Sequence, residues 1–318
     1  MSNKQLKDEI IALAKSNWAD IVGFAPASRF EDDDPIFRIM PEVKTVICLA
    51  FRNLRGSYRG VEEGTTYYQY STMSVENMEE TVMPMTRIKV ANLIESYGYT
   101  ALPQRRQQRI MKEENETNPE MIFDSIFRNI EAEPQMDFER SAMLCGIGEI
   151  GLHGGLINDE FGPMIRYCFI LTDAEIEPDE VKKPHLCDKC GECMKACPGK
   201  AITEDGVENS WQCAVYYNGA SGITNPFMSP GAYADLENRL EVIAGEAQVT
   251  PERAWDILKK THFYPPIGHF YSTSLCGRAC HRACYVHLEE KGALTREFHG
   301  KFRKREPWHF SIEDYDVL

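Results

Sequence analysis

The feature that most constrains this chain of 318 residues is a run of four closely spaced cysteines before a proline, Cys187-x2-Cys190-x2-Cys193-x3-Cys197-Pro198. A cubane cluster needs four thiolates that converge from different directions, and cysteines spaced by two residues in a tight loop supply three of them. The fourth cysteine of such a run points away toward a second cluster, and the proline helps to end the turn. A structural zinc site would not need this fourth cysteine, so the spacing predicts binding of [4Fe–4S] clusters.

Ligands for a second cluster lie further along the chain. Cys276-x3-Cys280-x3-Cys284 supplies three and the lone Cys213 supplies one, which brings the total to eight cysteines, enough for two cubanes. Under the ferredoxin rule each cluster takes ligands from both segments. Cluster one then takes Cys187, Cys190, Cys193 and Cys284, and cluster two takes Cys197, Cys213, Cys276 and Cys280. The x3-x3 spacing places three cysteines near one face of a helix, and it leaves open which of them serves which cluster.

The other three cysteines, Cys48, Cys145 and Cys168, each lie in an apolar run, which favours packing in a core. The N-terminal residues are amphipathic with mixed charge and read as an ordinary helix, and no apolar run approaches the ~18 residues of a membrane span. We therefore expect a cytoplasmic protein with no membrane partner, where reducing conditions favour metal ligation over disulfides. The net charge of −14 opposes binding to nucleic acid without excluding it.

Helical and strand patterns alternate along the first half of the chain. Apolar residues recur at helical spacing over 3–17 and 76–97. Short apolar runs predict strands at 20–24, 43–51, 98–102 and 166–172. The run at 43–51 is continuous, which suits a strand buried on both faces. This alternation predicts an α+β fold. We expect an α/β core over residues 1–178 and a ferredoxin-like two-cluster domain over 179–318, with a helical insertion at about 230–262 and a C-terminal tail.

A glycine-rich stretch precedes the cysteine motif and reads CGIGEIGLHGGLINDEFGP over residues 145–163. Together with the cysteine motif, it resembles the segment before the clusters in corrinoid-dependent reductive dehalogenases and in epoxyqueuosine reductases. The amino-acid sequence of the stretch is closer to that of the dehalogenases. The lone Cys213 within WQCAVYY is instead similar to the lone cluster cysteine of the epoxyqueuosine reductases. The resemblance covers residues 140–215 well and the N-terminal part loosely.

This resemblance implies a nitroreductase-like core, a ferredoxin-like module after it, and a base-off cobalamin between the core and the nearer cluster. The two clusters would pass low-potential electrons from a donor such as ferredoxin or flavodoxin to cobalt, which would reduce a small-molecule substrate. We expect the stretch to bind the corrinoid through Gly146, Gly148, Gly151, His153, Gly154, Gly155 and Asn158. Its glycines would let the backbone approach a large ligand closely, although turn formation alone also explains them.

The resemblance also implies catalytic side chains near the corrinoid. Arg166 stands where the dehalogenases carry a basic residue beside a tyrosine proton donor, but no tyrosine falls in register. The epoxyqueuosine reductases use an aspartate whose place here reads Glu131-Ala132-Glu133, so Glu133 is the candidate general acid. A strand-end arginine and a solvated acidic loop are the alternative interpretations of these residues.

Two other functions stay open at the level of sequence. One is an epoxyqueuosine reductase that acts on tRNA, which the spacing of Cys213 favours and which the acidic charge and the missing aspartate oppose. The other is a corrinoid-free electron-transfer protein that reactivates cobalamin in a partner enzyme. The missing catalytic acid and tyrosine favour this last hypothesis.

Overall fold

The computed structural model describes residues 3–105, 135–207, 209–261 and 274–316. The chain divides into two compact units, and neither is continuous in sequence. The first unit comprises Met1–Asn53, Asn77–Gly151 and Gly155–Cys187, and the second comprises Leu54–Glu76, Leu152–Gly154 and Asp188–Leu318. The predicted domain boundary at residue 178 is simpler than the observed division into two units, because the prediction assigns the 54–76 segment to the first domain. The predicted boundary stays a prediction.

A four-stranded sheet with the order β1-β2-β6-β3 forms the centre of the first unit, and every neighbouring pair in it is antiparallel. The strands are β1 Ile21–Pro26, β2 Thr45–Arg52, β3 Ala101–Gln104 and β6 Ile165–Thr172. All four lie where the apolar runs predicted them, within a few residues. β2 is buried along its length except at Arg52, as expected for a strand covered on both faces.

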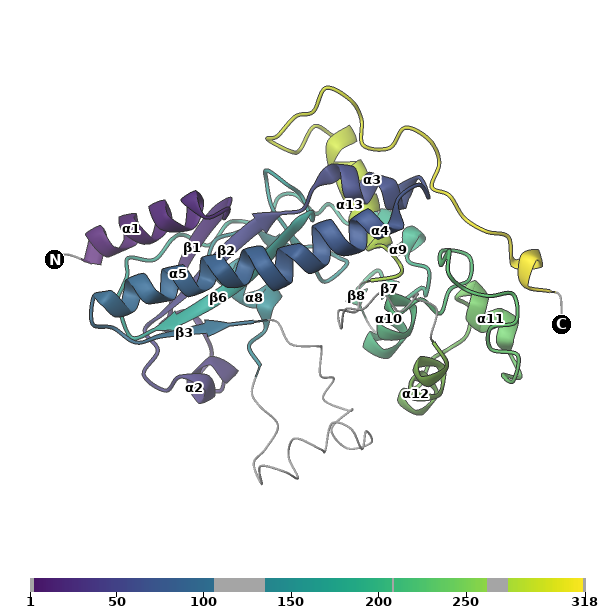
Figure 1. Ribbon diagram of the computed structural model, residues 1–318, viewed down its shortest axis with the longest axis horizontal. Helices are drawn as coiled ribbons and strands as arrows, with labels where there is room; N and C mark the ends of the chain where they lie inside the picture. The colour runs from purple at the N-terminus through teal and green to yellow at the C-terminus, as the bar shows by residue number, and fades with distance from the viewer. Residues whose placement is uncertain (1–2, 106–134, 208, 262–273, 317–318) are drawn as a thin grey trace. The chain divides into compact units, whose positions relative to one another are not determined.

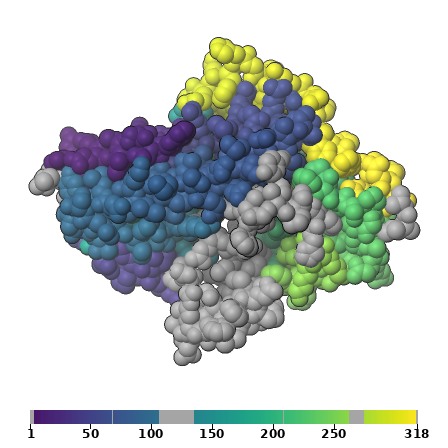
Figure 2. All heavy atoms as spheres, in the orientation of Figure 1, coloured from purple at the N-terminus to yellow at the C-terminus, as the bar shows by residue number. Residues whose placement is uncertain are grey.

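Helices α1 (Asn3–Ser16) and α5 (Met83–Ser96) cover one face of this sheet (Figure 1). Their apolar positions, including Ile10 and Val90, pack on alternate strand residues such as Ile47. Figure 2 shows the two helices side by side on the surface of this unit, α1 in purple and α5 in blue. The helix predicted over 3–17 is therefore confirmed.

The opposite face of the sheet is covered by α2 (Pro35–Ile39) and α8 (Phe138–Leu144). The ring of Phe138 meets that of Phe169 edge-on, with 4.9 Å between centroids. Cys48, one residue along from Ile47, points to this face, because successive strand side chains alternate. The first unit thus has three layers, with a separate apolar core on each side of the sheet.

The three cysteines outside the cluster motifs lie in these cores. Cys48 and Cys145 belong to the α2/α8 side and Cys168 to the α1/α5 side, and each is at most 1% exposed. Burial raises the pKa of Cys168 to about 12, so its thiol stays neutral. Packing is therefore confirmed as the role of these residues.

The helix predicted over 76–97 is not uniform. It is present as the π-helical segment η3 (Met78–Val82) followed by α5, and a further π-helical segment, η2 (Tyr70–Glu76), precedes it. Periodicity near 3.6 residues does not distinguish these wider turns from an α-helix. The first unit also contains η1 Ala27–Arg29 and the hairpin β4 Glu149–Ile150 with β5 Leu156–Ile157.

The second unit is mainly helical. Its elements are α3 Arg55–Glu62, α4 Tyr67–Gln69, η2, α9 Glu192–Ala196, β7 Ile202–Thr203, β8 Gly206–Val207, α10 Ser210–Tyr217, α11 Arg239–Ala244, α12 Pro251–Lys260, α13 Ala279–Glu290 and η4 Ile312–Tyr315. The helix predicted at 251–260 is confirmed as α12, which Thr250 caps by accepting from the Arg253 N–H. The one predicted at 232–245 is shorter, because turns occupy the chain before Arg239.

A buried ion-pair triad ties the C-terminal tail to this unit. Glu62, at the end of α3, is 1% exposed and binds Arg282 of α13 and Arg303 of the tail. Trp308 donates its indole N–H to the Val61 carbonyl at 2.7 Å. We call Glu62, Arg282 and Arg303 the Glu62 triad. It holds the helix that carries two of the predicted cluster ligands.

The described residues thus form an α+β fold of mixed helices and strands, whereas a nitroreductase-like core stays a prediction. Within the same residues, every helix is too short or too polar to span a bilayer.

Candidate iron–sulfur centre

The second unit brings together the four cysteines predicted for cluster two. Cys197 follows α9, Cys213 lies on α10, Cys276 precedes α13, and Cys280 is in the first turn of α13. Burial raises the pKa of the Cys280 thiol well above its ordinary value, and the neighbouring sulfurs of Cys276, Cys213 and Cys197 raise it further. Burial and then Cys276 likewise raise the pKa of Cys197. Such effects fall off with distance, so the sulfurs of Cys276, Cys213 and Cys197 lie in the neighbourhood of Cys280.

Donors beside these sulfurs suit thiolate ligands. The Ala201 N–H donates to Cys197 Sγ at 3.3 Å. Ser274 is 1% exposed, and its hydroxyl lies 3.0 Å from Cys276 Sγ. Because Cys280 lies in the first turn of α13, the unsatisfied N–H groups of that helix end also favour negative charge on sulfur. Hydrogen bonds of this kind accompany cluster ligands, so the donor set fits a [4Fe–4S] cubane.

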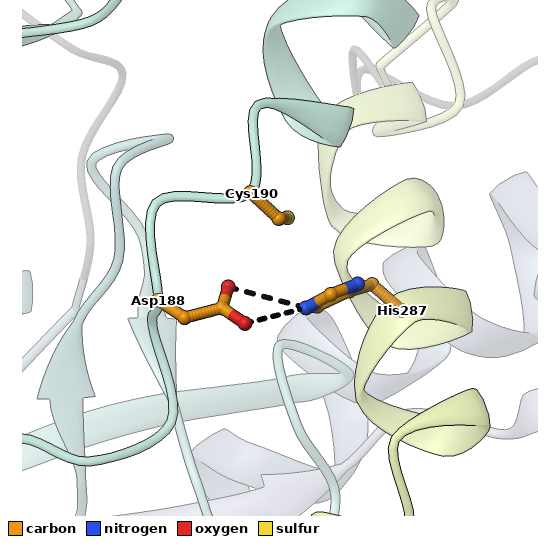
Figure 3. A group of neighbouring side chains, drawn as sticks. All are labelled: Asp188, Cys190 and His287. Carbon is orange, nitrogen blue, oxygen red and sulfur yellow. Dashed lines mark hydrogen bonds and ion pairs between the residues drawn. The ribbon is translucent and has the colours of Figure 1, made fainter.

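The loop that carries the first cysteines meets the other end of α13 (Figure 3). His287 Nε2 lies 3.0 Å from the Asp188 carboxylate, to which Lys291 Nζ also donates at 2.8 Å. One ligand atom each of Asp188, Cys190 and His287 lies within 4.8 Å of the others. His287 is one helical turn beyond Cys284, so this face of α13 is turned toward the Cys190 loop. That placement supports Cys284 as a ligand of cluster one.

Glu149 is a site residue that the sequence analysis missed. Its carboxylate is 3% exposed and accepts three backbone N–H groups at the start of the cysteine loop. His185 and Leu186 donate to Oε2 at 2.6 and 3.0 Å, and Cys187 donates to Oε1 at 2.8 Å. The only signal in the sequence is an acidic residue inside an otherwise apolar, glycine-rich stretch. Glu149 fixes the backbone that presents the first predicted ligand.

The glycines at the start of the 145–163 stretch are explained by close contacts within the protein. Gly146 has φ +76°, and a Cβ there would lie 2.4 Å from the Glu180 carbonyl oxygen. A Cβ on Gly148 would lie 2.0 Å from the Ile157 carbonyl oxygen. Both positions therefore need glycine for the folding of the first unit alone. A role in corrinoid binding stays a prediction for these two residues.

The remaining predicted corrinoid residues divide between the units. In the first unit, the Gly151 N–H donates to the Gly155 carbonyl at 3.0 Å, and the buried Asn158 side chain donates to the Ile147 carbonyl at 2.5 Å. Asn158 Oδ1 also accepts the Glu160 N–H at 2.8 Å, which closes the turn after β5. These contacts stabilise the local backbone.

His153 and Gly154 belong to the second unit. The His153 ring is 7% exposed and lies against that of His281, with 4.6 Å between centroids. Burial, reinforced by the charge of Arg278, lowers the pKa of His153 to about 4. His153 is therefore neutral near pH 7. Gly154 has φ +71°, and a Cβ there would lie 3.3 Å from the Val207 side chain.

Of the two predicted catalytic residues, the described structure includes Arg166. Arg166 lies at the start of β6 and forms an ion pair with Glu79 of η3, both side chains being largely buried. Glu133 lies outside the described residues. The proposed role of each stays a prediction.

Comparison with known proteins places the cluster motif in context. Residues 181–203 match the 4Fe-4S binding domain. The chain is 40% identical over 73 residues to epoxyqueuosine reductase from Prochlorococcus marinus (strain NATL2A), a match that covers 23% of each protein. It is 39% identical over 67 residues to tetrachloroethene reductive dehalogenase from Desulfitobacterium hafniense, covering 20% of this chain and 12% of that protein. The chain thus matches under a quarter of the length of these relatives.

A solved epoxyqueuosine reductase from Bacillus subtilis aligns with 91% of this chain and 83% of its own, at 16% identity and a TM-score of 0.47. Agreement at that level does not establish a shared function. The sequence matches carry the relationship instead. They confirm the resemblance to both groups of reductases: this chain carries a 4Fe-4S binding segment and is related, over part of its length, to epoxyqueuosine reductases and to reductive dehalogenases.

Proposed function

We propose that this chain is a cytoplasmic iron–sulfur reductase that passes low-potential electrons through two [4Fe–4S] clusters to a base-off corrinoid, which reduces a small molecule. A ferredoxin or flavodoxin would supply the electrons. The observation that supports the proposal is the electrostatic influence of Cys276, Cys213 and Cys197 on Cys280, together with the hydrogen-bond donors beside Cys197 and Cys276. Three separate chain segments contribute these residues, and a disulfide framework would not require four sulfurs in one neighbourhood.

The protein's own residues have defined tasks in this proposal. Each cluster, when bound, would supply a one-electron centre. Glu149 holds the backbone of the first ligand loop, and the Ala201 N–H and the Ser274 hydroxyl stabilise negative charge on the sulfurs beside them. The Glu62 triad holds α13, whose first turn bears Cys280 and whose next turn bears Cys284. Together these contacts keep the ligands in place while the charge changes.

The corrinoid, the nitroreductase-like core and the small-molecule substrate derive their support from the resemblance of the 145–163 stretch. The glycine contacts in the first unit lend no additional support, because protein backbone already occupies the space beside Gly146 and Gly148. No task above depends on the corrinoid. The two cofactors can therefore be tested separately.

The test is anaerobic reconstitution of the purified chain with iron, sulfide and cobalamin, followed by metal counts and a visible spectrum. We expect about eight iron atoms per chain, two cubanes of four. Cys213→Ser should remove one cluster, whereas Cys48→Ser, at a buried core position, should retain both. A wild-type chain that binds about four irons would refute the two-cluster proposal. A chain with two clusters that loses all cobalt on gel filtration would instead be a corrinoid-free electron-transfer protein.

The epoxyqueuosine reductase hypothesis remains the second candidate, because the relative from Prochlorococcus marinus matches as closely as the dehalogenase does. It predicts binding to tRNA despite the net charge of −14. A gel shift with unfractionated tRNA at low salt tests it, since electrostatic binding is strongest there. Absence of a shift for the reconstituted protein would remove this candidate.

A further inference from the structure

Arg278 occupies an unusual position beside the proposed cluster two. It is the residue before α13, midway between Cys276 and Cys280, and its backbone is left-handed at φ +51°. Its N–H donates to Ser274 Oγ at 3.3 Å, the same hydroxyl that meets Cys276 Sγ. A non-glycine residue rarely adopts this conformation without a local reason. The turn directs the side chain into the unit instead of away from it.

The guanidinium of Arg278 has aromatic neighbours instead of an acid. Its Cζ lies 5.1 Å from the centre of the Tyr217 ring. Burial lowers the pKa of Arg278, whereas Tyr217, Tyr70 and Tyr58 raise it. Among the described residues, no carboxylate forms an ion pair with it. Arg282, in the first turn of α13, pairs with Glu62. Two arginines four residues apart thus have different partners, an aromatic ring for Arg278 and a carboxylate for Arg282.

A partly buried cation that has no carboxylate partner among the described residues is costly to fold. The cost falls if an anion lies near it, and Tyr217, against which the guanidinium packs, is one helical turn beyond Cys213 on α10. A cubane held by four thiolates is anionic, and its negative charge grows on reduction. A nearby positive charge therefore favours the reduced state more than the oxidised state.

The cations near cluster one lie close to solvent instead. There, His287 and Lys291 share the Asp188 carboxylate, and the exposed Lys195 pairs with Glu192. That loop is also exposed, and solvent screens the charges around it. The electrostatic environments of the two proposed clusters therefore differ in screening.

We propose that Arg278 is a positioning residue whose positive charge raises the reduction potential of cluster two above the value set by its thiolates alone. Cluster two then holds an electron more readily than it would without this charge. This inference rests on the proposed function, because it requires that both clusters bind.

The experiment is a redox titration of the reconstituted protein, monitored by the electron paramagnetic resonance of the reduced clusters, with iron content measured on the same samples. Arg278→Gln should lower the potential of one cluster and leave the other unchanged. At a fixed solution potential we expect its reduced-to-oxidised ratio to fall about tenfold, which is ~59 mV for a one-electron couple. Arg278→Lys retains the charge and should restore most of the ratio.

Lys200→Gln is the matched control. Lys200 is three residues beyond Cys197, but its side chain is exposed and paired with Glu246 at 3.4 Å. The same loss of charge at this screened position should leave both potentials unchanged. A control shift equal to that of Arg278→Gln would show a non-specific effect and overturn the inference.

The remaining outcomes are separable. Wild-type protein without two clusters refutes the proposed function. Arg278→Gln with full iron and unchanged potentials refutes the charge effect, and so does an Arg278→Lys protein shifted as far as the glutamine variant. If Arg278→Gln does not retain iron, the Arg278→Lys variant distinguishes a charge effect from a packing role. An Arg278→Lys protein that retains both clusters at a near wild-type potential supports the charge effect. An Arg278→Lys protein that loses its clusters assigns Arg278 to packing alone.

Discussion

Replacement of Glu149 tests how the cysteine loop is held. Glu149→Ala would leave three backbone N–H groups, those of residues 185–187, without their acceptor. Hydrogen bonds to a charged group contribute about 1.5–3 kcal/mol each. Three bonds to one carboxylate are not independent, so we expect a total loss of about 3–5 kcal/mol in the free energy of unfolding. Glu149→Gln retains one carbonyl acceptor and should cost about half as much.

Urea unfolding monitored by circular dichroism measures the stability, and iron content after reconstitution measures the effect on the loop. Both variants should lose stability in the order alanine more than glutamine, and the alanine variant should bind less iron. Glu180→Gln, at an exposed carboxylate of the same segment, is the control and should change stability by less than about 0.5 kcal/mol. If Glu149→Ala behaves like this control, the carboxylate does not hold the loop and the reasoning is wrong.

Three further predictions concern stability. Burial lowers the pKa of His153 to about 4, so between about pH 6.5 and 4 the unfolded chain binds a proton that the folded chain does not. The free energy of unfolding should therefore fall as the pH drops through this range. His153→Asn should reduce this pH dependence, measured as the midpoint of urea unfolding. Arg282→Met leaves a buried carboxylate with one partner and should cost about 3–5 kcal/mol, against under about 1 for the exposed Arg305→Gln, by urea unfolding. Gly148→Ala should lower the melting temperature through its clash with a backbone oxygen, by an overpacking cost of about 1–3 kcal/mol, whereas Gly231→Ala, which meets no atom within 4 Å, should leave it within a degree or two of wild type. An acid-insensitive wild type, an Arg282 variant as stable as its control, or a Gly148 variant that melts with wild type would each contradict the corresponding argument.

The strands and the 4Fe-4S binding segment were predictable because each depends on a local pattern. A continuous apolar run such as 43–51 has few alternatives to a buried strand, and the Cys187–Cys197 spacing has few alternatives to cubane ligation. The gathering of Cys213 with Cys276 and Cys280 was predictable for a different reason. A cluster needs four ligands, so the count of cysteines limits the pairing even where the spacing is unusual.

Long-range contacts were not predictable from the same patterns. Glu149 and Glu62 are acidic residues that a hydropathy pattern assigns to the surface, yet both are buried because their partners arrive from distant segments. The glycine-rich stretch leaves two interpretations open. Gly146 and Gly148 suit a ligand cradle, but the same absence of a Cβ also permits close approach of the protein's own backbone. Sequence alone does not distinguish these two uses of glycine.

The discontinuity of the second unit has a consequence for the order of events during synthesis. α3 leaves the ribosome early, but the Arg282 partner of Glu62 lies 220 residues later in the chain. Until α13 has been translated, the Glu62 carboxylate stays hydrated and Cys213 lacks the neighbours that surround it in the fold. With the proposed ligand set, both clusters would be completed only after α13 has been translated. By then the first unit already has all of its described strands.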